Sequence, residues 1–187
     1  KMIKMNIPSG YFAMGYYLEN GYGVEPDKMA SLAYFRKAAD LGNPEGQYVI
    51  GRLFLNKKLG NGQKNLLFRP EIGKAMLICS ANNGFGPAAN ELANHYQLVE
   101  EDYKMATYYY QLGVMNGDYY SAMDLQKAFK SPPSTDKLTY LNLSRDDERV
   151  HRYSLIRSEI DKNPFARFPD LDKIVPLPPA PLPKWDG

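Results

Sequence analysis

Apolar residues recur at spacings of three and four along much of the chain, and this pattern predicts amphipathic helices. Residues 27–42, DKMASLAYFRKAADLG, show it most clearly, with a wide apolar face and Asp27 placed to cap the helix start. Residues 101–117 repeat the pattern, and neither segment contains a proline. The sequence therefore predicts two helices, which end at Gly42 and Gly117.

The helix ends recur in register, because three glycines stand at the same place in successive repeats: Gly42, Gly84 and Gly117. A glycine after a helix adopts the left-handed conformation without a side-chain penalty. Small residues in the neighbouring helices would allow close packing, and they stand at Gly15, Gly51 and Ala93. Self-similarity at this period indicates stacked helix pairs.

The periodicity stops at Pro132 and Pro133, which end the array. A further helix is expected from about Ser144 to Asn163, with acidic residues in its first turn, and we expect it to cap the last repeat. Six prolines between residues 169 and 183 favour an extended conformation for the tail. Two interpretations remain open: the tail packs on the protein itself, or it faces a partner.

Composition narrows the function classes. The 187 residues are 44% hydrophobic and carry a net charge of +2, and no basic stripe indicates nucleic acid. Fifteen tyrosines suit either a repeat core or a protein interface. The single cysteine, Cys79, excludes an intramolecular disulfide, and its apolar neighbours predict a buried thiol. No run is long enough to span a membrane. Because the first residue is Lys1, we expect that a signal peptide or lipid anchor has been removed.

The sequence shows no enzyme signature. His95 and His151 lack a histidine or cysteine at metal spacing, so no metal site is predicted. No nucleophile elbow or phosphate-binding loop is present. Acidic runs such as residues 100–102 stand at expected helix starts, where capping explains them better than catalysis. We therefore predict a non-enzymatic protein without a cofactor.

The segment YFAMGYYLENGYGVEPDKMASLAYFRKAADLGNPEG resembles the Sel-one-like repeat family, relatives of the tetratricopeptide repeats, nearly end to end. The resemblance covers residues 8–130, although the loop at 55–70 is longer than the family pattern and lacks its signature. It implies an all-α fold: a right-handed α-solenoid with a concave, protein-binding face, a C-terminal capping helix and an extended proline-rich tail. The expected domains are the solenoid at 1–130 and the C-terminal part at 131–187.

The C-terminal segment also resembles a known domain. DERVHRYSLIRSEIDKNPFARFPDLDKIVPLPPAPLPKWDG is similar to a domain of unknown function that follows Sel-one-like repeats in many proteobacterial proteins. Such proteins resemble immunity partners of type VI secretion toxins, notably lipase or phospholipase D-type effectors. The resemblance therefore implies an immunity protein that neutralises such a toxin by protein–protein contact.

Two function hypotheses follow from the resemblance. The first is the immunity protein, expected in the periplasm, with the cytoplasm as the alternative. The second is a scaffold or adaptor that organises a bacterial complex, as other Sel-one-like proteins do. An adjacent effector gene would favour the first.

Partner contacts are predicted on the first helix of each pair, which usually lines the concave face of such arrays. The candidate residues at positions that the repeat pattern leaves free are Tyr16, Glu19, Gln47, Arg52, Asn90, Asn94 and Asp124. Tyr119 and Tyr120 are added because they stand at the start of the last repeat. The alternative is that these are ordinary solvated or packing positions. The loop between Asn56 and Arg69 is a further candidate, since specificity tends to lie in loops.

Overall fold

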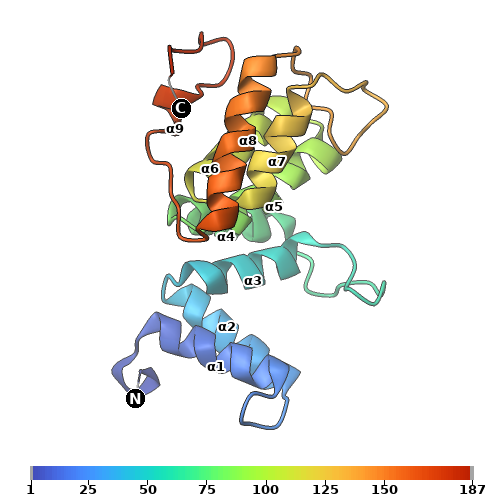
Figure 1. Ribbon diagram of the computed structural model, residues 1–187. Coiled ribbons are helices and arrows are strands. Elements are labelled where there is room, and N and C mark those ends of the chain that lie inside the picture. The colour runs from blue at the N-terminus through green and yellow to red at the C-terminus, as the bar shows by residue number, and fades with distance from the viewer. Residues whose placement is uncertain (1, 186–187) are drawn as a thin grey trace. The chain divides into compact units, whose positions relative to one another are not determined.

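The computed structural model describes residues 2–185, and over that range its regular structure is entirely helical (Figure 1). The prediction of an all-α fold is confirmed. Lys1, and the Asp186 and Gly187 of the C-terminal motif, lie outside the described residues. The chain divides into two compact units, unit 1 up to Phe85 and unit 2 from Gly86. The boundary predicted after residue 130 separates the repeats from the C-terminal part by their sequence resemblances, and it stays a prediction.

Unit 1 is built from helices that pack on their neighbours in sequence. A short 3-10 turn precedes four α-helices: η1 (Ile3–Met5), α1 (Pro8–Asn20), α2 (Lys28–Asp40), α3 (Pro44–Leu55) and α4 (Pro70–Asn82). Helix α1 packs on α2, α2 on α3, and α3 on α4 (Figure 1). The predicted cap is confirmed, because the Asp27 carboxylate accepts hydrogen bonds from the backbone N–H groups of Met29 and Ala30.

Small residues set the helix spacing in unit 1, as the repeat register predicts. A Cβ atom on Gly15 would lie 2.7 Å from the Phe35 ring, and one on Gly51 would lie 2.9 Å from Leu77. Phe35 and Ile50 form the centre of the local core. The glycines therefore admit the large side chains that the adjacent helix supplies.

Unit 2 contains further repeat helices and the C-terminal part. Its elements are α5 (Gly86–His95), the π-helical turn η2 (Tyr96–Glu100), α6 (Tyr103–Met115), α7 (Tyr119–Ala128), α8 (Asp147–Lys162) and α9 (Leu171–Ile174). Helix α5 packs on α6, α6 on α7, and α7 on α8. The three predicted helix-ending glycines are confirmed as left-handed, with φ of 84°, 87° and 72° at Gly42, Gly84 and Gly117.

Helix α8 covers α7, in agreement with the capping role expected for it. It begins at Asp147, later than the Ser144 predicted, because the Asp146 carboxylate caps it by accepting from the backbone N–H of Arg149. Tyr153, Ile156 and Ile160, spaced three and four residues apart, are buried on one face of the helix. Arg149 is also buried, although a charged side chain is ordinarily expected in solvent.

The proline-rich tail lies on unit 2. The Arg149 guanidinium donates hydrogen bonds to the carbonyl oxygens of Pro176 (2.9 Å) and Ala180 (2.6 Å). Arg152 reaches further along the tail, to the carbonyl of Pro183 at 2.9 Å. Of the two interpretations left open by the sequence, the structure favours a tail that packs on the protein itself.

The expectation for the cysteine is wrong, because Cys79 is exposed. Helix α4 buries the side that carries Gly73, Leu77, Ser80 and Ala81. Residue 79 projects away from that side, since each helical residue turns about 100° from its neighbour. The apolar neighbours of Cys79 in the sequence therefore did not predict its exposure correctly.

Candidate partner-binding site

The predicted partner-binding residues of unit 1 lie on α1 and α3. Tyr16 and Glu19 belong to α1, and Gln47 and Arg52 to α3. Glu19 and Arg52 line the same pocket. Tyr16 instead pairs with Tyr22, with ring centroids 5.8 Å apart. The Oε1 atom of Gln47 is buried and accepts no hydrogen bond from the described residues.

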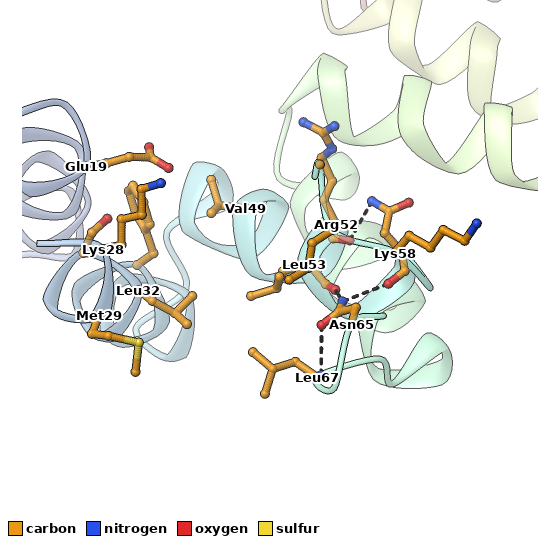
Figure 2. Close-up of a pocket in the computed structure, with 15 residues that line it drawn as sticks. Glu19, Lys28, Met29, Leu32, Val49, Arg52, Leu53, Lys58, Asn65 and Leu67 are labelled. Atoms are coloured by element: carbon orange, nitrogen blue, oxygen red, sulfur yellow. Dashed lines mark hydrogen bonds between the residues drawn. The ribbon is translucent and has the colours of Figure 1, made fainter. Parts of the chain in front are cut away.

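This pocket has a volume of about 640 Å³ (Figure 2). Leu32 of α2 and Val49 of α3 stand on one side of it, and Leu53 and Leu67 stand on the other (Figure 2). Charged groups border the apolar lining, including Glu19 from α1 and Lys28 from α2. Apolar walls with a few polar groups at the edge are typical of binding sites.

The loop between α3 and α4 forms one wall of the pocket and is an ordered hairpin. Asn65, only 3% exposed, holds its base by donating hydrogen bonds to the carbonyl oxygens of Leu53 and Asn56. The backbone closes the hairpin, since Leu59 N–H donates to Gln63 C=O at 2.8 Å. The loop is therefore fixed by its own hydrogen bonds.

The predicted residues of unit 2 form a polar network. The Asn94 side-chain amide donates to Asn90 Oδ1 at 2.9 Å, and Asn90 donates to Ser121 Oγ at 3.2 Å. Asn90 also hydrogen-bonds to Asp124. Three of the predicted residues, Asn90, Asn94 and Asp124, are thus brought together on α5 and α7.

A buried tyrosine joins this network to the loop after α7. The Tyr110 hydroxyl lies 2.6 Å from Gln97 Oε1 and 3.1 Å from Asn94 Oδ1. Gln97 in turn donates to the carbonyl of Lys137 at 2.9 Å. Burial raises the pKa of the Tyr110 hydroxyl, so it stays protonated and donates a hydrogen bond. The side chains in this network serve the fold of unit 2 as well as its surface.

Asp124 is the titratable member of the network in the physiological range. Burial raises its pKa from 3.8 to about 6, and the carboxylate of Asp118 adds to the rise. Lys127 and the hydrogen bond from Asn90 act in the opposite direction. The folded protein therefore binds a proton at Asp124 more tightly than the unfolded chain does.

We expect Asp124→Asn to stabilise the protein relative to wild type more at pH 7.5 than at pH 4. Because the folded-state pKa is raised, ionised Asp124 destabilises the fold once the pH rises from 3.8 through about 6. The expected gain is about 1 kcal/mol, well below the full value of the shift because solvent screens this half-buried group. Urea unfolding of both proteins at the two pH values measures it. An equal stability difference at both pH values, or a carboxyl NMR titration with its midpoint near the unfolded value, would contradict the expectation.

Tyr119 and Tyr120 stand at the first turn of α7 and lie outside this network. Their rings are nearly perpendicular, with centroids 5.6 Å apart. Tyr119 packs under the Arg157 guanidinium of α8, 5.7 Å from its ring centroid. Tyr120 is 62% exposed, so of the two it is the one whose ring is free to meet a partner.

The sequence reasoning named the loop but missed the residues that shape it. Leu59 and Leu67 line the pocket, and three lysines line a second hollow of about 480 Å³ on the same loop, together with Gly62, Asn65 and Phe68. The lysines are Lys57, Lys58 and Lys64. A sequence signal was available, because residues 56–69 contain four basic and no acidic residues.

The described histidine, cysteine and carboxylate side chains do not form a metal cluster. Between residues 2 and 185, no three His, Cys, Asp or Glu side chains gather as a metal ion would require. His95 instead lies 3.0 Å from the Glu100 carboxylate. Within the same range, no helix has both the length and the apolar character needed to cross a membrane.

Comparison with protein families identifies the repeats. The Sel1 repeat model matches residues 8–43, 86–118 and 103–130, which include α1, α2, α5, α6 and α7. A domain of unknown function (DUF6396) matches residues 121–187. Residues 44–85, which carry the loop hairpin, fall between the matched segments.

Solved structures are similar to this chain over nearly all of its length. Immunity protein PA5088 from Pseudomonas aeruginosa is 30% identical over 96% of this chain and 65% of that chain, with a TM-score of 0.70. The chain thus spans less than two thirds of the length of PA5088. Immunity protein Pa5087 from the same organism is 27% identical over 96% of this chain and 78% of that chain, with a TM-score of 0.55.

A Sel1 repeat protein from Oxalobacter formigenes is 22% identical over 84% of this chain and 60% of that chain, with a TM-score of 0.67, which shows a shared fold alone. Among curated proteins, none matches the chain. The helix pairs, the glycine-ended repeats and these matches agree: the chain contains Sel1 repeats in both of its units, and its residues 121–187 are similar to the DUF6396 domain.

Proposed function

We propose that this chain is an immunity protein, which binds a cognate toxin and neutralises it by protein–protein contact. The observation that carries the proposal is the similarity to two immunity proteins, which in each case extends over 96% of this chain. The similarity therefore includes the repeats, the segment between them and the C-terminal part. Sel1-type helix pairs suit this role because they offer binding surfaces without chemistry of their own.

The toxin class follows from the resemblance of the C-terminal segment. We propose a type VI secretion lipase or phospholipase, of the phospholipase D type, as the partner. Covering its catalytic cleft or its membrane-docking surface would neutralise it. Because such effectors attack membranes, we place the encounter in the periplasm, with the cytoplasm as the alternative.

Binding and inhibition test the proposal together. We expect one-to-one binding to the lipase or phospholipase encoded beside the gene, with a dissociation constant near 10 nM, as is typical of a standard-sized specific interface. Calorimetry measures the affinity and stoichiometry, and hydrolysis of phospholipid measures inhibition by one equivalent. A phospholipase from an unrelated operon is the control and should stay active.

An effector that is neither bound nor inhibited would contradict the proposed function. If the effector does not bind and remains active in excess of this protein, the immunity function is wrong. A scaffold or adaptor role would then be the better account of the Sel1 repeats.

A further inference from the structure

We propose that the hairpin between α3 and α4 is the element of unit 1 that docks an acidic surface of the toxin, with an apolar side chain of the toxin inserted into the adjoining pocket. This inference rests on the proposed immunity function and adds to it the docking surface and the chemistry of the partner. We call residues 56–69 the basic hairpin.

The positive charge of the basic hairpin favours an acidic partner. The basic hairpin carries Lys57, Lys58, Lys64 and Arg69 without a carboxylate, in a chain whose net charge is only +2. Positive charge is thus concentrated on one ordered loop. Complementary charge steers partners together and fixes their register, so the matching surface would be acidic.

Two lysines of the basic hairpin lie opposite each other. Lys58 and Lys64 form an isolated antiparallel bridge. Like charges directly opposite each other on a hairpin are destabilising. Repulsion between the two ammonium groups lowers the stability of the free protein. Carboxylates of a partner that bind between these groups would remove the repulsion.

The basic hairpin has a fixed conformation before a partner binds. Asn65 fixes its base, and Lys57 lies over the Phe68 ring at 5.9 Å from the centroid. Because the loop is already ordered, binding does not have to order it, and this preorganisation raises affinity. The Sel1 model does not match residues 44–85, so the hairpin lies outside the matched repeats and is free to carry specificity.

The pocket beside the hairpin favours a protein over a lipid surface as the occupant. Its volume of about 640 Å³ is recessed between α2, α3 and the hairpin, with Leu32 and Leu53 among its walls. A recess of this kind accepts a projecting side chain, as the central anchor of a protein interface does.

Charge reversal tests the acidic contact. We expect Lys58→Glu/Lys64→Glu to weaken binding of the adjacent lipase or phospholipase about 100-fold at low salt, with a smaller loss at high salt. Lys4→Glu/Lys37→Glu is the matched control, because it changes the charge of unit 1 equally at exposed positions away from the hairpin. The control should bind within about threefold of wild type. Circular dichroism confirms that both variants are folded.

Filling the pocket tests the apolar contact. Gly60 lines the pocket, and a Cβ atom there would have no heavy atom within 4 Å, so the position accepts a side chain and Gly60→Phe introduces a ring at the pocket. We expect it to weaken effector binding about 10-fold by occupying the place of the partner's side chain. Lys37→Phe, which adds a ring at an exposed position away from the hairpin, is the control and should bind within about threefold of wild type.

The outcomes separate the two proposals. If wild type does not bind the effector, the immunity function and this inference both fail. If wild type binds and Lys58→Glu/Lys64→Glu binds as well as the control, this inference alone is wrong. Vesicles of phosphatidylcholine and phosphatidylglycerol provide the remaining comparison: a charge reversal that abolishes vesicle binding but not effector binding would assign the basic hairpin to a membrane and overturn the protein contact.

Discussion

Replacing Arg149 with alanine should lower the free energy of unfolding by about 3 kcal/mol, because it removes a buried charge that several groups depend on. The Arg149 side chain is only 8% exposed and pairs with Asp146. It also holds the carbonyl oxygens of Pro176 and Ala180. The truncation leaves these acceptors without their donor, which is the costly way to break a buried interaction. Urea unfolding measures the loss, and hydrogen exchange should rise with it at the tail residues that carry an amide hydrogen, such as Val175, Leu177 and Ala180.

Arg145 provides the matched control for this prediction. It pairs with Asp147 at 3.0 Å, but both side chains are at least 70% exposed. Exposed pairs contribute little, so Arg145→Ala should change the free energy of unfolding by less than about 0.5 kcal/mol. Equal losses for the two variants would show that burial and the tail contacts of Arg149 do not matter.

A Gly73→Ala substitution should lower the free energy of unfolding by about 2 kcal/mol, although alanine is the better helix former. A Cβ atom at Gly73 would lie 2.7 Å from both Gly51 O and Leu55 N. These are backbone atoms of α3, so no side chain can rotate away and the two helices must separate. Thermal unfolding of the variant measures the effect.

Gly60→Ala is the control, because Gly60 has open space around its Cβ position. We expect its stability to stay within about 0.5 kcal/mol of wild type. A Gly73→Ala variant that is as stable as Gly60→Ala would mean that α3 and α4 are not closely packed at Gly51.

The repeat elements could be predicted from the sequence because their signals are local. A glycine that ends a helix acts through its own φ, and φ is 84° at Gly42 as expected. Asp27 caps α2 through groups two and three residues away. The all-α fold followed from such signals, since each of them is complete within one or two helical turns.

The features that escaped prediction depend on contacts between distant segments. Asn65 orders the basic hairpin by hydrogen bonds to Leu53 and Asn56, and a sequence pattern does not reveal such partners. Arg149 is buried because tail residues bring carbonyl oxygens to it. A charged side chain in a helix is ordinarily expected in solvent.

The candidate site was predictable in part. The repeat register placed Asn90, Asn94 and Asp124 on the first helices of two pairs, and the structure brings these three together. Whether they contact a partner stays a prediction, as it does for the other candidate residues. The walls of the pocket in unit 1 could not be predicted, because Leu59 and Leu67 reach it only through the fold of the hairpin.

The two arginines of α8 hold the tail mainly through its main chain, and Arg152 also lies over the Trp185 ring at 5.1 Å from the centroid. Arg149 and Arg152 donate to carbonyl oxygens of residues 174, 176, 180 and 183, and none of these bonds involves a tail side chain. Every residue has such a carbonyl, proline included. The docked tail can therefore exchange many of its outward side chains over evolutionary time and keep its place on unit 2, so diversity in the outer surface of the tail is compatible with one constant anchoring mechanism.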